Sequence, residues 1–173
     1  MVRDLLEAIR EQYLLDWDGL HGIGHWARVC ENGLRIASGS GADAQVLTCF
    51  ALFHDACRKN QGWDPGHGKR GADLAARLRG RVFDMDDTRF ALLARACAGH
   101  TSGRSDPSPT VLACWDSDRL DLARAGISPD PSLLNTEAAR DPELIAWASA
   151  RSLARCIPDF VKSEWCADPN GGD

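Results

Sequence analysis

The sequence lacks a long apolar run and a secretion signal. No stretch stays apolar over the roughly 20 residues that a membrane-spanning helix needs. The first residues, MVRDLLEAIREQYLL, carry acids where a secretion signal would have a basic and then an apolar stretch. We therefore expect a cytoplasmic location and no membrane partner.

Paired cysteine motifs are also missing. The chain has seven cysteines, an odd number, and no CxxC pair. Five of them lie inside apolar helical patterns, which predicts reduced and mostly buried thiols: Cys30, Cys49, Cys57, Cys97 and Cys114. A cysteine nucleophile or a cysteine-ligated zinc ion is therefore not expected.

An excess of basic residues is lacking as well. The 20 Lys and Arg residues are outnumbered by 25 Asp and Glu residues, which gives a net charge of -5. Nucleic-acid binders hold phosphate backbones with clustered Lys and Arg, so no stable nucleic-acid partner is expected. With 173 residues, 44% of them hydrophobic and 26% charged, the chain is typical of one soluble domain with a full core. The composition does not indicate an oligomeric state.

No strand pattern, internal repeat or low-complexity segment is visible, and helical periodicity dominates. The fold is therefore predicted to be all-α, with a single domain over residues 1–165 and a flexible tail at 166–173. Apolar spacing predicts a first helix through Leu5, Leu6, Ile9 and Tyr13. Further helices are expected over 25–38, 43–58, 69–79, 83–100, 109–126 and 142–156.

Loops rich in Gly, Pro, Asn and Ser are expected to separate these helices at 59–68 and 101–109. The turn-rich segment 127–140 is either a lid or a packed connection. Core positions are expected at Val29, Leu34 and Ile36 of the second helix, and at Trp26, Trp63 and Trp115.

Polar residues collect at the ends of the central helices. His54 and Asp55 follow four apolar residues, FALF, at a position where two polar groups are costly to bury. His25 lies early in the second helix, and each later helix also presents one His or Asp: His67, His100 and Asp116. This pattern is typical of a metal site between the helices of a bundle. Nitrogen and carboxylate ligands suit one or two divalent ions such as Mn, Fe, Zn, Co or Ni.

The order of His25, His54-Asp55 and Asp116 resembles the H…HD…D signature of the HD superfamily of metal-dependent phosphohydrolases. The resemblance covers roughly residues 20–125. The stretches HGIGHWARV, FALFHDACR, DPGHGKRGA and WDSDRLDLARAGI are also similar to an uncharacterised bacterial subgroup of that superfamily. The resemblance implies a helical bundle with a metal site between its central helices.

Two-metal members of the superfamily have two more histidines between the doublet and the last aspartate. His67 and His100 match those positions, although the gap from His54 to His67 is shorter than in many members. The resemblance thus implies six metal ligands: His25, His54, Asp55, His67, His100 and Asp116. Alternatively, His100 is a helix C-terminal histidine and His67 a loop residue.

Other polar residues near these ligands are candidates for catalysis and phosphate binding. Asp55 could bridge two ions and is the central catalytic residue. His21 is interpreted as a substrate or proton-transfer residue at the mouth of a pocket, or else as a solvated loop residue. Arg58 follows the doublet by three residues, where the superfamily often has a cation near the phosphate, but it could also be a helix C-terminal cation. Further candidates for a positive rim that binds an anionic substrate are Lys69, Arg70, Arg104 and Arg119.

The leading hypothesis is a metal-dependent hydrolase that cleaves a phosphoester of a small phosphorylated metabolite, or of a nucleotide. Divalent ions would activate water and neutralise the phosphoryl oxygens. One alternative is an HD-fold di-iron oxygenase, because such enzymes also hold two irons with four His and two Asp; in this reading Tyr13, the only tyrosine, covers the site. The other is a non-catalytic HD module that senses a ligand; the complete set of polar residues argues against it.

Overall fold

The computed structural model describes residues 2–161 and 165, and over these residues the chain is all-helical apart from one isolated β-bridge between Arg79 and Phe83. The helices are α1 (Val2–Arg10), α2 (Ile23–Ser40), α3 (Ala44–Phe53), α4 (His67–Leu78), α5 (Asp87–Gly99), α6 (Pro109–Arg119), η1 (Leu122–Ala125), η2 (Pro131–Leu133), η3 (Ala138–Arg140) and α7 (Pro142–Leu153). The predicted all-α, single-domain fold is confirmed, and the expected tail at 166–173 lies outside the described residues. No helix of the described part combines the length and apolarity needed to cross a bilayer.

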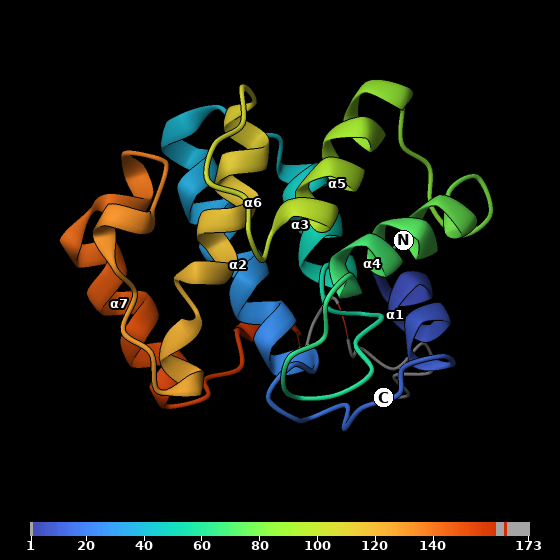
Figure 1. Ribbon diagram of the computed structural model, residues 1–173, viewed down its shortest axis with the longest axis horizontal. Coiled ribbons are helices and arrows are strands. Elements are labelled where there is room, and N and C mark those ends of the chain that lie inside the picture. The colour runs from blue at the N-terminus through green and yellow to red at the C-terminus, as the bar shows by residue number, and fades with distance from the viewer. Residues whose placement is uncertain (1, 162–164, 166–173) are drawn as a thin grey trace, which may run out of the picture.

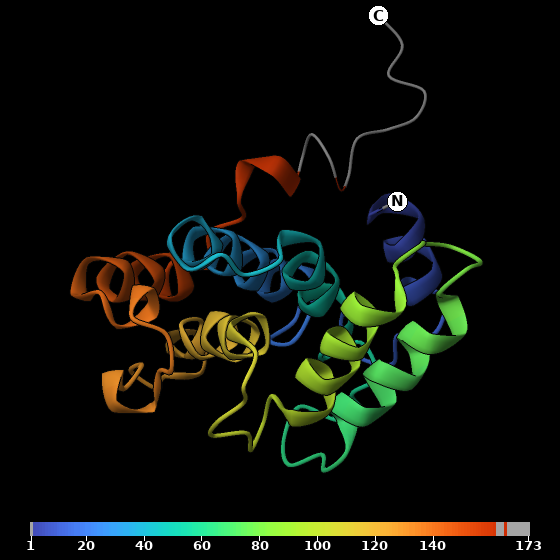
Figure 2. The same ribbon diagram turned by 90° about the horizontal axis from the view of Figure 1, so that it is seen from above.

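Helix α3 forms the centre of the core. Asp43 caps its N-terminus by accepting hydrogen bonds from the backbone N–H groups of Gln45 and Val46. Seven of its residues, between Val46 and Phe53, are buried, so most of the helix surface is covered. Helices α2, α5 and α6 pack against it, with α7 outside α2 and with α1 and α4 on the other flank (Figures 1 and 2).

Three helix boundaries differ from the predictions, and all three matter for the polar residues. Helix α3 ends at Phe53 rather than at residue 58, so His54 and Asp55 lie on the turn that follows it. Helix α4 begins at His67, inside the expected loop. Helix α6 ends at Arg119, and the chain continues as the short helix η1 up to Gly126, which adopts a positive φ of 77°.

Several predicted core positions also need correction. Tyr13 lies beyond the end of α1, where its ring packs edge-on against Trp17 and Trp26. Leu34 is 39% exposed and Trp63 is 81% exposed. Val29, Ile36, Trp26 and Trp115 are buried as predicted, and so are the expected cysteines except Cys57, which is half-buried.

Two glycines let α4 lie close to its neighbours. A Cβ atom on Gly68 would collide with the carbonyl oxygen of Cys97 in α5, and one on Gly71 would collide with the carbonyl oxygen of Phe53. Only residues without a side chain allow this approach. The close packing brings His67, at the start of α4, next to the ends of α3 and α5.

Candidate metal centre

The polar side chains of the centre lie at or near the ends of helices. His25 lies in the first turn of α2, His54 caps the C-terminus of α3, and Asp55 follows it. His67 opens α4, and His100 caps the C-terminus of α5. All five are buried, with exposed fractions between 0% and 6%. The structure therefore brings together five of the six residues that were predicted as ligands.

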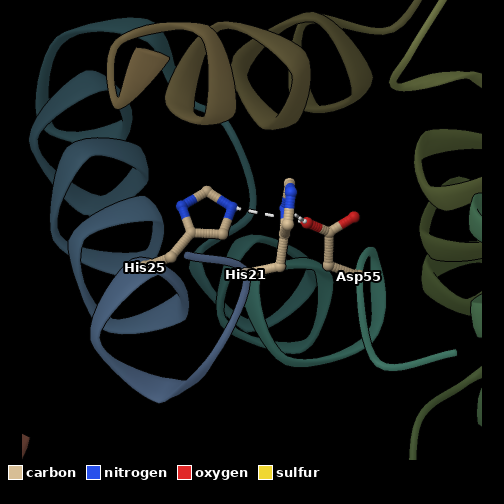
Figure 3. Close-up of side chains that lie close together, drawn as sticks. All are labelled: His21, His25 and Asp55. Atoms are coloured by element: carbon tan, nitrogen blue, oxygen red, sulfur yellow. Dashed lines mark hydrogen bonds and ion pairs between the residues drawn. The ribbon is translucent and has the colours of Figure 1, made fainter. Parts of the chain in front are cut away.

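Three groups of side chains are close enough to share an ion. They are His21, His25 and Asp55; His25, His54 and Asp118; and Asp55, His67 and His100. Within each group the candidate ligand atoms lie within 4.8 Å of one another. Figure 3 shows the first group, with the side chains of His25, His21 and Asp55 gathered at the ends of α2 and α3.

Asp55 links the groups, because its two carboxylate oxygens face different histidines. Its Oδ2 lies 2.8 Å from Nδ1 of His21, 3.7 Å from Nε2 of His25 and 3.8 Å from Nε2 of His54. Its Oδ1 lies 3.1 Å from Nε2 of His67 and 3.7 Å from Nε2 of His100. A carboxylate in this position can bridge two cations. We call His25, His54 and Asp118 the α2–α6 side of the centre, and His67 and His100 the α4–α5 side.

The spacing of the nitrogen atoms fits ligands that share one ion. Ligand atoms about 2.1 Å from a common ion and at right angles around it lie about 3 Å apart. The Nε2 atoms of His25 and His54 are 3.1 Å apart, and those of His67 and His100 are 2.9 Å apart. Each side of the centre therefore has the donor types and the spacing for a divalent ion.

The hydrogen bonds of the ring nitrogens show which atoms remain for a metal. Nδ1 of His25 lies 2.8 Å from a carboxylate oxygen of Asp121, and Nδ1 of His54 lies 3.1 Å from the carbonyl oxygen of Ala51. Nδ1 of His67 and of His100 likewise faces a backbone carbonyl oxygen, at 2.6 Å and 2.8 Å. These oxygens only accept, so each Nδ1 carries a proton and each ring points its Nε2 into the centre.

The pKa values of the side chains on the α2–α6 side favour the binding of a cation. Burial lowers the pKa of His25, and it lowers that of His54 to about 3, so both rings are neutral at pH 7. Burial alone would raise the pKa of Asp55, but the surrounding histidines hold it well below its usual range. His100 differs, because the carboxylates of Asp55 and Asp118 outweigh burial and raise its pKa. An ion on the α4–α5 side would therefore compete with a proton.

Asp116 does not join the centre, and Asp118 takes the place expected for it. The carboxylate of Asp116 accepts hydrogen bonds from the backbone N–H groups of Asn135 and Thr136, from the Asn135 amide and from the Thr136 hydroxyl. These four donors satisfy the buried carboxylate, which fixes the 134–136 segment against α6. Asp118 instead lies with Oδ1 3.4 Å from Nε2 of His25 and 3.9 Å from Nε2 of His54.

Asp121 is a further residue of the centre, and it was not among the predicted site residues. Besides His25, it accepts hydrogen bonds from Nε and Nη2 of Arg28, at 2.7 Å and 3.1 Å. These donors hold the pKa of Asp121 at about 2 against the effect of burial, so the carboxylate is ionised at neutral pH. A carboxylate behind a ligating histidine fixes the ring and makes Nε2 a stronger ligand. The only signal in the sequence is the spacing of acids in WDSDRLD.

A cavity of about 530 Å³ opens onto the centre and is lined by Asp55, Asp118, His67 and His100, with His21 on its wall. Four arginines also line it: Arg58, Arg104, Arg119 and Arg124. Lys69 and Arg70, both predicted to bind substrate, are not among the lining residues. Lys69 is exposed and paired with Asp73, while Arg70 is bound to Asp64 at 2.7 Å.

Two of the arginines contact the centre directly. Nη1 of Arg58 lies 3.3 Å from Oδ1 of Asp55 and 3.1 Å from Nε2 of His67. Nη2 of Arg124 lies 3.1 Å from Nε2 of His25. Arg119 instead donates to the carbonyl oxygens of Leu133 and Gly103, so it braces two loops around the cavity. Arg58 was predicted at this place; Arg124 was not.

The chain is similar to a protein of known structure. No family model matches the chain, and no curated protein matches it significantly. A solved structure does: a predicted HD superfamily hydrolase from an uncultured Thermotogales bacterium. It is 30% identical, with a TM-score of 0.65, over 94% of this chain and 90% of the other.

The chain belongs to the HD superfamily. The resemblance noted in the sequence is confirmed at the level of family and fold. In this member the adjacent residues His54 and Asp55 lie within a cluster of His and Asp side chains that could hold metal ions.

Proposed function

We propose that this HD-superfamily protein is a metal-dependent phosphohydrolase that cleaves a phosphoester of a small phosphorylated compound. The observation that carries the proposal is the convergence of four histidine Nε2 atoms and two carboxylates beneath a cavity with arginines in its wall. Acceptor groups crowded in this way, away from water, favour a cation among them. Arginines beside such cations favour an anionic substrate.

The donor set suits two ions. His25, His54, Asp55 and Asp118 would hold one, and Asp55, His67 and His100 the other. Imidazole nitrogens and carboxylates fit Mn, Fe, Co, Ni or Zn. Divalent ions held there would supply Lewis-acid chemistry, which neutralises phosphoryl oxygens and makes water more acidic.

The arginines of the cavity supply the anion-binding part of the mechanism. Arg58 and Arg124 point N–H groups at the two sides of the centre, where the phosphoryl oxygens of a bound ester would lie. Both side chains are mostly buried, with exposed fractions of 9% and 6%. Charge-assisted hydrogen bonds are strong in such a place because little water competes for them.

His21 is the titratable group best placed to move a proton. It lies on the cavity wall, its Nδ1 is 2.8 Å from Oδ2 of Asp55, and its side chain is 12% exposed. Tyr13 donates a hydrogen bond to the carbonyl oxygen of His21 at 2.9 Å, which fixes the backbone there. In this position His21 donates a proton to the leaving oxygen of the substrate.

The test is release of inorganic phosphate by the manganese-loaded protein across a panel of nucleotides and phosphorylated metabolites. Asp55→Ala serves as the blank, because it removes the carboxylate shared by both sides. We expect release from at least one compound that disappears in the variant. Protein shown to carry two metal ions but inactive on every phosphoester would overturn the proposal.

The di-iron oxygenase alternative rests on the same set of four His and two Asp, and the position of Tyr13 was only a weak additional observation. The Tyr13 hydroxyl instead hydrogen-bonds to the backbone of His21, and its ring packs against Trp17 and Trp26. That observation no longer favours oxygen chemistry. Oxygen uptake by the iron-loaded protein, without phosphate release, would favour it again.

A further inference from the structure

Trp63 has an unusual position for so large an apolar side chain. It is 81% exposed, yet it lines the cavity above the metal centre. Exposed tryptophans are uncommon, because the indole ring is large and mostly apolar. Several exposed apolar side chains around one cavity are a feature of ligand-binding grooves.

The loop that carries Trp63 is held firmly in place. The backbone carbonyl of Gly62 accepts a hydrogen bond from Arg58 at 2.7 Å. On the other side, the carboxylate of Asp64 accepts from the backbone of Lys59 and from Arg70, both at 2.7 Å. The indole ring is thus exposed on a loop whose backbone is held in part by Arg58, which also contacts the centre.

A later segment of the chain also contributes exposed apolar side chains to the cavity lining. Ile127 and Leu133 are 54% and 45% exposed and line the same cavity. Their segment is fixed by Arg119, which donates to the carbonyl oxygen of Leu133, and by Asp116, which binds the 135–136 backbone. In Figure 2 the loop before α4 and the segment that includes η2 lie along the same edge of the molecule.

The cavity is therefore polar at its buried end, while its exposed lining holds three large apolar side chains, Trp63, Ile127 and Leu133, among polar ones. Its volume of about 530 Å³ lies within the range of about 300–1,000 Å³ for sites that take a whole small molecule, so it has room beyond a phosphate group. A phosphoester bound with its phosphate on the centre would extend its leaving group towards the rim. A flat ring would be recognised there, since aromatic side chains bind rings by stacking.

We propose that Trp63, together with Ile127 and Leu133, forms an apolar subsite that selects phosphoesters whose leaving group carries a flat aromatic ring. This inference rests on the proposed phosphohydrolase function. Trp63 acts as a specificity-determining residue: it binds the ring of the leaving group and does not take part in the cleavage.

The test compares AMP with ribose 5-phosphate, which share the same phosphorylated sugar and differ by the adenine ring. In the manganese-loaded protein, Trp63→Ala is expected to raise KM for AMP about tenfold, since base–aromatic stacking has about this effect. It should leave kcat for AMP and kcat/KM for ribose 5-phosphate nearly unchanged. Trp63→Phe, which keeps an aromatic ring, should restore most of the binding.

Leu14→Ala is the matched control. Leu14 is 73% exposed and does not line the cavity, so the variant also removes an exposed apolar side chain. Leu14→Ala should leave KM and kcat unchanged for both AMP and ribose 5-phosphate. Equal losses on AMP and ribose 5-phosphate in Trp63→Ala would overturn the subsite. An unchanged KM for both, with a change from dimer to monomer in size-exclusion chromatography, would also overturn it and assign Trp63 to a contact between two copies.

A binding measurement separates failure of the subsite from failure of the proposed function. Calorimetry would use an AMP analogue in which a CH2 group replaces the bridging ester oxygen, with methylphosphonate as the probe that lacks a ring. Binding of the analogue that weakens about tenfold in Trp63→Ala, in a protein that hydrolyses nothing, would support the subsite and refute the hydrolase. Binding of the analogue that does not depend on Trp63 would refute the subsite alone.

Discussion

The two sides of the metal centre are built in different ways. On the α2–α6 side, the ligands come from helices of the core, and Asp121 and Arg28 orient His25 from behind. On the α4–α5 side, His67 and His100 are oriented by backbone carbonyls, and Arg58 already donates to Nε2 of His67. An arginine N–H lies 3.1 Å from a histidine Nε2 on each side, Arg124 at His25 and Arg58 at His67, so the arginines do not distinguish the two sides. The difference lies in the support behind His25 and in the raised pKa of His100, and it indicates a weaker site on the α4–α5 side, where an ion must compete with a proton.

The largest expected difference is between the two acids of α6. Asp118→Asn removes a charged ligand from the α2–α6 side and should lower phosphate release by about 100-fold or more, with little change in stability. Asp116→Asn should instead lower the free energy of unfolding by about 2–3 kcal/mol, because it disturbs four hydrogen bonds to a buried carboxylate. Denaturant unfolding and activity assays on both variants test this. A catalytic loss in Asp116→Asn at full stability would contradict the assignment.

A second variant breaks the α4–α5 side alone. Gly68→Ala places a methyl group against the Cys97 carbonyl and 2.8 Å from Nδ1 of His100, so α4 must move away from α5. We expect binding of one ion instead of two, and an unfolding free energy lower by about 1–3 kcal/mol.

Gly39→Ala is the control for that variant. Gly39 lies near the end of α2, and a Cβ there meets nothing within 4 Å. It should keep both ions and be as stable as the wild type or more stable by up to about 1 kcal/mol. Metal analysis by mass spectrometry reads the ion count of both variants, and two ions in Gly68→Ala would show that close packing of α4 is not needed.

A smaller effect is expected behind His25. Asp121→Asn keeps the size of the side chain but removes the charge that strengthens its hydrogen bond to the His25 ring. Manganese affinity on the α2–α6 side should therefore fall about 10- to 100-fold. The α4–α5 side should keep its affinity, which a calorimetric titration can resolve. Equal weakening of both sites would mean that Asp121 acts on the whole fold and not on His25.

The smallest effect is expected at Lys69. Its ammonium group is exposed and paired with Asp73, so Lys69→Ala should change KM by less than about twofold. Arg58→Ala should raise KM by about tenfold or more, since it removes a buried, charge-assisted donor. Steady-state kinetics on both variants test whether the anion site lies inside the cavity. A large effect of Lys69→Ala would place the anion on the outer surface.

Much of the centre was predictable because helix ends and adjacent polar residues leave a signal in the sequence. His25, His54 and Asp55 stand out by their order and by the apolar residues before the doublet. The choice between Asp116 and Asp118 was not predictable in this way. The two lie about 200° apart on one helix, and what satisfies Asp116 is a segment without periodicity that folds back from residues 134–136.

The direction of side chains on the loops was also not predictable from the sequence. Trp63 was expected in the core because large aromatic residues are usually buried, but loop residues have no periodicity that would show which way they face. Lys69 and Arg70 are close to His67 in sequence, yet the helix that starts at His67 turns them away from the cavity. Side chains on loops and first turns depend on tertiary packing, which the sequence pattern does not contain.

The most direct test of the central claim is a calorimetric titration of the metal-free protein with Mn2+, in the wild type and in Asp55→Ala. We predict two ions per chain in the wild type, the second bound more weakly, and loss or severe weakening of both in the variant. Wild-type protein that binds no more Mn2+ than Asp55→Ala would contradict the claim that Asp55 joins two metal sites.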